Sequence, residues 1–251
     1  MTRREGGFIG TQPNWDAANR PGVWNILDIY NRQRRNLWIR SSDPFINSVV
    51  CDLRFDGNNN GIVFADSGPL LLPVSQIGST GVVTSTTRFK YGNASALFPD
   101  TNGYLSINSP NLALGTGNFT IEMWLFAATS RINNGILSFG TSNSVFSNIL
   151  YASSNLLNAP NASNITALPL NQWFHLAYVR EGTGTNQAKI YSNGVLINTA
   201  SNATNYSQTF YNIGIYFGTG YCWGANMDNF RVTKAARYTA NFNPNTDTYM
   251  S

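Results

Sequence analysis

The sequence has few charged residues, one histidine and two cysteines. Asp, Glu, Lys and Arg together make up 11% of the 251 residues. Because His175 is the only histidine, a site built on several imidazoles is excluded. Cys51 and Cys222 form no metal-binding spacing motif. We interpret them as two buried thiols of a protein made in a reducing cytoplasm, with a disulfide between them as the alternative.

Long apolar segments are also missing. No run of about 18 apolar residues occurs, so no transmembrane helix and no membrane partner are expected. The first seven residues are basic, but no apolar stretch follows them, and we expect no secretory signal.

Catalytic motifs are absent as well. A glycosidase needs two carboxylates at roughly 5–10 Å from each other, and the chain has no Glu-x-Asp or Asp-x-Glu pair. Glu122 stands alone in its apolar segment, so we interpret it as a structural group. His175 lies inside another apolar segment and receives the same interpretation. Without a catalytic triad, a phosphate-binding loop or a His-Glu-x-x-His motif, no enzymatic activity is expected.

What the sequence does contain is a strand-and-turn pattern, clearest in residues 171–199. Apolar side chains on both alternating positions from Trp173 to Val179 predict a strand that is covered on both faces. Asn193-Gly194 separates two further apolar runs and favours the two-residue turn of a β-hairpin. Three consecutive antiparallel strands are therefore expected here.

Shorter apolar runs predict strands along the rest of the chain, and the whole indicates an all-β, antiparallel two-sheet sandwich over residues 46–251. A pair of strands is expected around the turn at residues 100–103, and a short turn of helix at 233–238. The expected strands outside the hairpin are residues 49–55, 62–64, two within 70–90, 94–98, 104–107, 119–126, 136–139, 149–151, 165–168, 211–217 and 227–232.

Residues 1–45 differ from the rest and are interpreted as an N-terminal arm. They hold seven arginines and four carboxylates, a charge of +3 out of the net +4 of the chain. Pro21 and the apolar spacing after it predict one short helix over 22–37. The arm has little core of its own, so we expect its large and basic side chains to attach the protein to a partner. These candidate attachment residues are Trp15, Trp24, Tyr30, Arg34, Arg35 and Trp38. No nucleic-acid-binding fold accompanies the arginines, so nucleic acid is not an expected partner.

Four segments resemble, in order, the laminin-G-like, concanavalin A-like jelly-roll domains. They are YGNASALFPDTNGYLSI (91–107), GTGNFTIEMWLF (115–126), LNQWFHLAYVREGTGTNQAKIYSNGVLINTA (170–200) and MDNFRVTKAARYTANFNP (227–244). The last segment is similar to the closing motif of family members encoded by tailed bacteriophages. Residues 21–38 resemble the N-terminal leader of phage structural proteins.

The resemblance implies a non-enzymatic virion structural protein, either a capsid decoration or a fibre or tail component. Such a protein would be assembled in the host cytoplasm, and its arm would bind capsid, portal or tail proteins. We also expect a homo-oligomer. The alternative is a carbohydrate-binding, lectin-type module that adsorbs to a host-surface glycan. A glycoside hydrolase is disfavoured by the missing carboxylate pair.

The resemblance also suggests a calcium ion, because related jelly rolls often bind one between the first and last strands. The candidate ligands are Asp56, Asp66 and Asp228, of which Asp228 lies where such families place a ligand. Backbone carbonyls of the Asp56 and Asp66 loops could complete a calcium shell of six to eight oxygens. The alternative is that Asp56 and Asp66 cap tight turns through their own backbone.

A glycine-rich loop near residue 220 supplies the candidate carbohydrate or partner site. Tyr216, Tyr221 and Trp223 could stack on sugar rings or become buried against a protein. The alternative is that these rings pack within the core and its loops.

Overall fold

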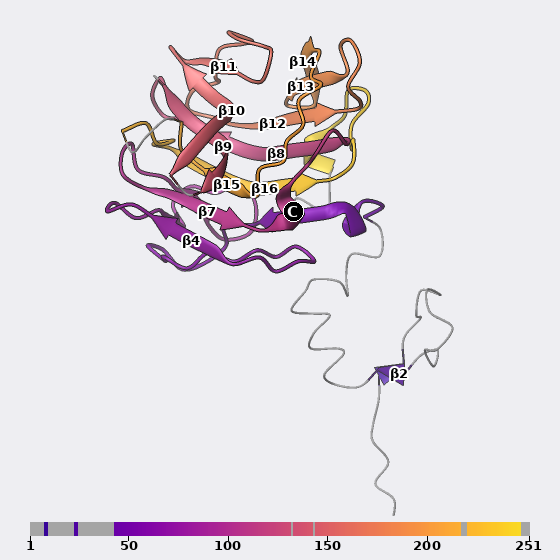
Figure 1. Cartoon of the computed structure of the whole chain (residues 1–251). Helices are drawn as coiled ribbons and strands as arrows, with labels where there is room; N and C mark the ends of the chain where they lie inside the picture. Colours follow the sequence, from indigo (N-terminus) through magenta and orange to yellow (C-terminus); the bar gives the residue numbers. More distant parts are fainter. Residues whose placement is uncertain are drawn as a thin grey trace, which may run out of the picture.

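The computed structural model describes two short N-terminal strands and the ranges 43–131, 133–142, 144–216 and 220–246. The two short strands are β1 (Phe8–Ile9) and β2 (Val23–Trp24), which pair antiparallel (Figure 1). The predicted helix over 22–37 is therefore wrong at Val23 and Trp24, and its other residues lie outside the described ones. The candidate attachment residues Trp15, Tyr30, Arg34, Arg35 and Trp38 also lie outside them.

The predicted all-β sandwich is confirmed, and its two sheets are antiparallel throughout (Figure 1). The six-stranded sheet has the order β11-β10-β9-β15-β7-β4. Its strands are β4 (Val74–Ile77), β7 (Tyr104–Asn108), β9 (Asn134–Ser142), β10 (Val145–Ser153), β11 (Leu156–Asn158) and β15 (Phe210–Ile213).

The eight-stranded sheet has the order β14-β13-β12-β8-β16-β6-β5, and β3 also pairs with β16. Its strands are β3 (Val49–Leu53), β5 (Val83–Ser85), β6 (Ser95–Leu97), β8 (Phe119–Phe126), β12 (Trp173–Arg180), β13 (Ala188–Ser192), β14 (Val195–Ala200) and β16 (Asn226–Thr233). Three short 3-10 turns complete the described elements: η1 (Ile46–Ser48), η2 (Pro110–Leu112) and η3 (Pro244–Thr246). No helix in the described part of the chain is long and apolar enough to cross a membrane.

The core lies between the two sheets and follows from strand alternation. One face of β8 carries four buried apolar side chains, as its sequence predicts: Phe119, Ile121, Met123 and Leu125. The six-stranded sheet contributes apolar partners from β7 and β15 to the same cluster. Side chains on the other face of each strand therefore point away from the core, to the outer face of their sheet.

The meander of β12, β13 and β14 is confirmed. Asn193 and Gly194 have φ values of 49° and 77°, as the two-residue turn requires. A Cβ on Gly194 would also lie 1.9 Å from the backbone oxygen of Phe242, so only glycine fits there.

Several local expectations are wrong. The segments 94–98 and 104–107 do not pair, because β6 joins β5 and β16 while β7 joins β4 and β15 in the other sheet. The turn at 99–103 thus connects the two sheets, with β6 in the eight-stranded sheet and β7 in the six-stranded sheet. The segment 62–64 forms no strand, and its Ile62 and Val63 are 65% and 82% exposed. The segment 165–168 makes only an isolated bridge to β11 through Ala167. In 233–238, β16 ends at Thr233, a bend follows at 234–235, and no helix forms. In 211–217, β15 ends at Ile213.

Both cysteines are buried thiols that form no disulfide, as the first interpretation expects. Cys51 packs in the main core, whereas Cys222 belongs to a small cluster with Tyr104 and Ile215.

The folded domain reaches further towards the N-terminus than its expected start at residue 46. Asp43 is buried and its carboxylate forms an ion pair with the buried guanidinium of Arg231 on β16. Asp43 also accepts a hydrogen bond from the backbone N–H of Phe45 at 2.8 Å. Residues 43–45 therefore pack with the jelly roll.

Candidate functional site

The six-stranded sheet has no charged residue in any of its strands. Its outer face carries hydroxyl and amide side chains in one cross-strand row, from Ser75 through Ser106 and Asn212 to Ser138. Ser106 Oγ donates to Asn212 Oδ1 at 2.7 Å, so neighbouring members of the row orient each other. Of this row, Ser75 is exposed, whereas Ser106, Asn212 and Ser138 are buried. The face therefore carries no charge on its strands, and most of its polar row is covered.

A groove of about 250 Å³ lies at the β4 end of this face. Its lining combines hydroxyl and amide groups with apolar surface, a mixture found in sites that bind small polar ligands. The lining residues are Pro73, Ser75, Ile77, Ser106, Asn108 and Phe210.

Three tyrosines form an aromatic ledge beyond the other end of the row. We call Tyr151, Tyr216 and Tyr221 the tyrosine ledge. The ring centroids of Tyr151 and Tyr216 are 4.6 Å apart, and those of Tyr216 and Tyr221 are 6.4 Å apart at nearly right angles. Tyr151 and Tyr216 are half-buried, and Tyr221 is 44% exposed. The ledge therefore offers aromatic surface to a ligand while its rings support one another.

The ledge lies on the same outer face as the polar row. Tyr151 alternates on β10 with Leu150 and Ala152, which point into the core. The backbone carbonyl of Tyr216 accepts a hydrogen bond from Ser138 Oγ at 3.3 Å. The ledge thus continues the neutral face of the sheet.

The loop that carries two of these rings is fixed to β9. The carbonyl of Tyr221 accepts hydrogen bonds from the backbone N–H groups of Tyr216 at 3.0 Å and Gly135 at 3.3 Å. A Cβ on Gly135 would lie 1.8 Å from the carbonyl carbon of Ile215. Only glycine permits this close approach, which sets the height of the ledge above the sheet.

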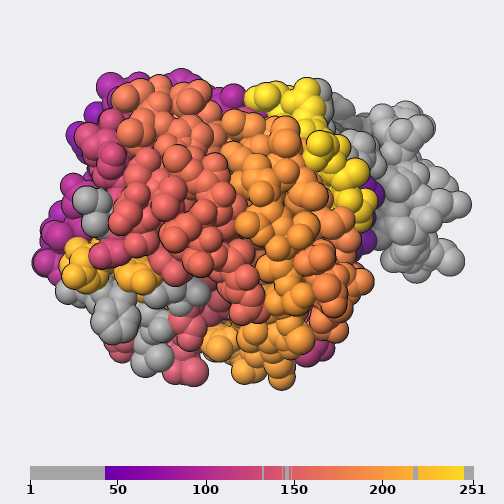
Figure 2. Space-filling model, turned by 90° about the horizontal axis from the view of Figure 1, so that it is seen from above, coloured from indigo at the N-terminus to yellow at the C-terminus, as the bar shows by residue number. Residues whose placement is uncertain are grey.

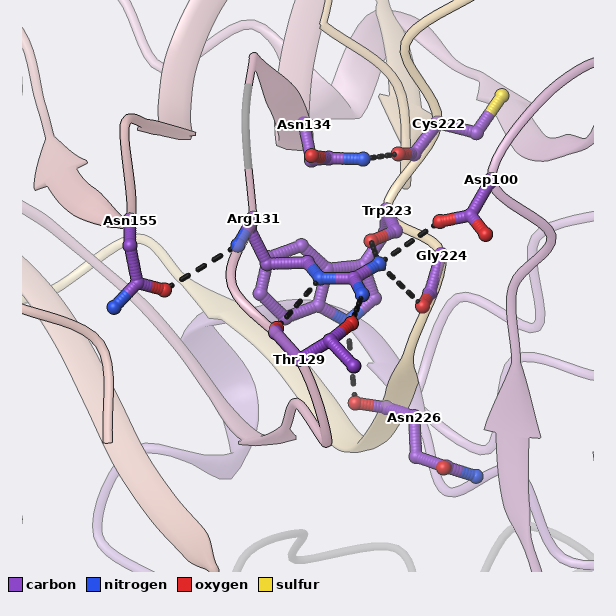
Figure 3. Close-up of polar contacts among 9 residues, drawn as sticks. All are labelled: Asp100, Thr129, Arg131, Asn134, Asn155, Cys222, Trp223, Gly224 and Asn226. Carbon is purple, nitrogen blue, oxygen red and sulfur yellow. Dashed lines mark hydrogen bonds and ion pairs between the residues drawn. The ribbon is translucent and has the colours of Figure 1, made fainter. Parts of the chain in front are cut away.

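Arg131 fixes the other side of the loop (Figure 3). Its Nη1 donates to Asp100 Oδ1 at 2.9 Å and to the carbonyls of Gly224 at 2.6 Å and Trp223 at 3.3 Å. Its Nε donates to the carbonyl of Thr129 at 3.0 Å, and Nη2 donates to the Thr129 hydroxyl. These charge-assisted bonds join three loops at one end of the sandwich.

The exposure of the groups in this network is uneven. The side chain of Arg131 is 8% exposed, whereas that of Asp100 is 75% exposed. Asn134 Nδ2 donates to the Cys222 carbonyl at 2.5 Å and adds a further tie from β9 (Figure 3). The network therefore buries its cation and presents its carboxylate to solvent.

The structure separates the three aromatic residues that the sequence suggested. Tyr216 and Tyr221 lie on the ledge, but Trp223 is fully buried, and its Nε1 donates to the Asn226 carbonyl at 3.2 Å. A buried indole offers no face to a ligand, so the assignment of Trp223 to a binding surface is corrected to core packing. Sequence reasoning missed Tyr151, which is 65 residues before Tyr216 and meets it only because β10 borders β9.

The structure separates one of the three candidate calcium ligands, Asp66, from the other two. Asp228 is buried; its Oδ2 accepts from the backbone N–H groups of Lys90 at 2.7 Å and Tyr91 at 3.1 Å, and its Oδ1 has no hydrogen-bond partner. Burial, with a contribution from the charge of Asp56, raises the pKa of Asp228 to about 7. A buried carboxylate oxygen without a partner, close to a second carboxylate, fits part of a calcium site.

Asp66 does not fit that site. Its carboxylate accepts three backbone hydrogen bonds, from Asp52 at 2.8 Å, Gly68 at 2.9 Å and Leu72 at 2.8 Å. This is the turn-capping role that the sequence left as the alternative. Among the described residues, no group of three or more His, Cys, Asp and Glu side chains is placed to hold a metal. Calcium would therefore need Asp56, Asp228 and backbone carbonyls.

Glu122 lies on the outer face of the eight-stranded sheet beneath residues 234–244, which we call the closing segment. Figure 2 shows the C-terminal residues, in yellow, along the surface beside the orange part of the chain. Glu122 is fully buried and forms an ion pair with Arg237, and its Oε2 lies 3.4 Å from His175 Nε2. Burial alone would raise the pKa of Glu122, but the charge of Arg237 together with the lowering contributions of His175 and Arg231 outweighs it and holds the pKa well below its usual range.

Comparison with known families agrees with this architecture. Residues 99–241 match the Concanavalin A-like lectin/glucanases superfamily. The chain belongs to this superfamily. No curated protein matches the chain in sequence.

Several solved members of the concanavalin A-like fold are similar in structure. Domain 4 of AbnA, an extracellular arabinanase from Geobacillus stearothermophilus solved with arabinotriose, has a TM-score of 0.57 at 15% identity, over 75% of this chain and 93% of that one. A Trypanosoma rangeli sialidase solved with sialic acid has a TM-score of 0.56 at 13% identity, over 76% of this chain and 31% of the sialidase chain.

Botulinum neurotoxin type C, whose cell entry depends on two ganglioside molecules, has a TM-score of 0.55 at 17% identity, over 77% of this chain. The concanavalin A-like chain described here spans about half of that neurotoxin chain, 49%. Identities this low establish the shared fold alone. Neither the superfamily match nor these structures bear on a phage origin.

Proposed function

We propose that this protein is a carbohydrate-binding module that acts without turnover. The observation that carries the proposal is the tyrosine ledge, at the edge of a sheet face whose strands carry no charge. Sugars combine apolar C–H faces with many hydroxyls, so they need aromatic surface together with hydrogen-bonding groups. Tyrosine supplies both, with an apolar ring and a polar tip.

The frame under the ledge supports the same proposal. Binding costs less free energy when the binding groups are ordered beforehand. The backbone bonds from Gly135 and Tyr216 to the Tyr221 carbonyl, and the bonds from Arg131 to Asp100 and Gly224, fix the described residues on either side of the ledge. Two similar structures were solved with sugars bound, arabinotriose in one and sialic acid in the other.

We propose no turnover because the carboxylates do not form the pair that a glycosidase uses. Glu122 is buried under the closing segment and is ion-paired, so it cannot reach a sugar in this conformation. Asp100 is the one carboxylate in the Arg131 network, and the strands of the six-stranded sheet supply no second. A glycosidase would need a pair.

The virion setting remains a separate prediction. It rests on the closing motif at 227–244 and on the leader at 21–38, and it would make the glycan a host-surface receptor. Attachment through the arm to capsid, portal or tail proteins, and the homo-oligomer, are predictions of the same kind. Detection of the protein in a purified particle would support them.

A glycan array with the full chain tests the proposal. We expect saturable binding to at least one oligosaccharide, weakened about tenfold or more in Tyr221→Ala and in Tyr216→Ala, the loss expected when an anchoring ring is removed. Phe89→Ala is the matched control, because Phe89 is 42% exposed, close to the 44% of Tyr221, and lies on another loop. An array without binding, or an equal loss in the control, would contradict the proposal.

A further inference from the structure

We propose that the ligand of this face is a neutral glycan and that Asp100 is a specificity-determining residue for it. This inference rests on the proposed function and narrows it to one class of sugar. Uronate-containing, sialylated and sulfated glycans would be excluded.

The described segments that form the ledge and its surroundings carry few charged residues. Between residues 91 and 180 the sequence has four charged residues, Asp100, Glu122, Arg131 and Arg180, and residues 201–226 have none. Glu122 and Arg180 belong to the eight-stranded sheet. Arg180 is buried and donates to the carbonyls of Gly115, Gly117 and Thr204 at 2.7–2.9 Å. Within these described segments, Arg131 is therefore the cation on which an anionic sugar would depend.

Arg131 is already engaged by groups of the protein. Its Nε, Nη1 and Nη2 atoms all donate to groups of the protein, and 8% of its side chain is exposed. Recruiting it for a sugar carboxylate would leave the carbonyls of Trp223 and Gly224 without their donor. Leaving a buried polar group without its hydrogen-bond partner costs more free energy than the bond contributes to stability.

Asp100 lies beside the loop that carries Tyr221. The backbone N–H of Cys222, the residue after Tyr221, donates to the Asp100 carbonyl at 3.0 Å, and the Asp100 carboxylate lies against Gly224, where a Cβ would be 1.8 Å from Oδ1. The Asp100 side chain is 75% exposed, and Arg131 occupies Oδ1. An exposed carboxylate accepts strong, charge-assisted hydrogen bonds from sugar hydroxyls. The same charge repels an anionic sugar, which gives selection against the wrong ligand as well as attraction for the right one.

Neutral and acidic oligosaccharides of equal length, titrated into the full chain, test this inference. We expect binding of the neutral class, with an affinity that changes little between low and high salt, because no ion pair forms. Asp100→Asn keeps the side-chain shape and should weaken neutral binding about tenfold, since charge-assisted bonds become ordinary ones. Glu181→Gln is the control, because Glu181 is also a carboxylate in an ion pair, with Lys189, and its side chain is partly exposed, at 22%.

Three results would count against it in different ways. Salt-sensitive binding of an acidic glycan, lost in Tyr221→Ala, would overturn the neutral class and leave the glycan function in place. Neutral binding that is unchanged in Asp100→Asn would remove Asp100 from recognition. No binding of either class would overturn the proposed function itself. The comparison of the two glycan classes uses the wild-type chain, so it does not depend on how the variant folds.

Discussion

The hydroxyl of Tyr238 donates to Glu122 Oε2 at 2.7 Å and fastens the closing segment to the outer face of the eight-stranded sheet. The Tyr238 ring stacks on Phe242, with 3.5 Å between the ring centroids, and Phe242 in turn packs on Tyr191. A carboxylate that could be mistaken for a catalytic group thus anchors the last segment of the fold.

This anchoring predicts a stability that falls in acid. Glu122 has a pKa near 4.3 in an unfolded chain and a lower one in the folded protein. Its contribution is therefore fully present above about pH 5 and is lost as the pH falls through the folded pKa. Urea denaturation of the wild type between about pH 5 and pH 2 should show this loss, and Glu122→Gln should show a flatter profile. Equal slopes for the two proteins would contradict the account.

Asp228 predicts the opposite pH dependence in the absence of calcium. Its folded pKa of about 7 lies above the unfolded value near 3.9. Stability from the protonated form is present below about pH 4 and is lost as the pH rises through about 7. Asp228→Asn should therefore melt above the wild type at pH 8 in chelator.

Calcium should reverse that order. A ligand bound only by the folded state raises its stability, so added calcium should raise the melting temperature of the wild type but not that of Asp228→Asn. Asp66→Asn is the contrasting variant, because it loses stability by about 1–2 kcal/mol with or without calcium through its capped turn. A wild-type melting temperature that changes with neither calcium nor chelator would exclude a calcium site at Asp228.

The glycine under the ledge gives a third prediction. Gly135→Ala places a Cβ 1.8 Å from the Ile215 carbonyl carbon, and the free energy of unfolding should fall by about 2 kcal/mol or more. Gly220→Ala is the control, because a Cβ there meets no atom within 4 Å. Similar melting temperatures for the two variants would show that the loop is not held as described.

The arm gives a fourth prediction. Deleting residues 1–42 should leave the melting temperature of the domain unchanged. Deleting residues 1–45 also removes Asp43, the carboxylate that forms an ion pair with the buried guanidinium of Arg231. That second loss should cost about 3 kcal/mol. If the arm attaches the protein to a partner, both truncated proteins should also fail to assemble with that partner. Equal stability of the two truncations would contradict the boundary at residue 43.

The sequence predicted the elements better than their partners. Phe119–Phe126 and the Asn193-Gly194 hairpin follow from local alternation and turn chemistry, and the structure confirms both. The crossing of the chain from one sheet to the other between β6 and β7 could not be predicted. Two strands joined by a short turn have the same sequence pattern whether they pair in one sheet or lie in two different sheets. Asp66 and Asp228 carry the same local signal, and only long-range packing makes one a turn cap and leaves the other with an unpaired oxygen.

The same limit applies to the candidate site. Tyr216 and Tyr221 are visible in a glycine-rich loop, but nothing local distinguishes them from Trp223, which is buried. Exposure depends on which side of the loop faces β9, and Gly135 decides that from a distant segment. Tyr151 reaches the ledge through strand pairing alone.

The most direct test of the account is nuclear magnetic resonance of the full chain with labelled tyrosine rings, titrated with the strongest oligosaccharide of the array. The account predicts saturable shifts of the Tyr151, Tyr216 and Tyr221 ring signals, while those of buried Tyr178 and Tyr211 stay in place. Saturable shifts confined to other rings, with the three ledge tyrosines unmoved, would contradict the placement of the glycan on this face.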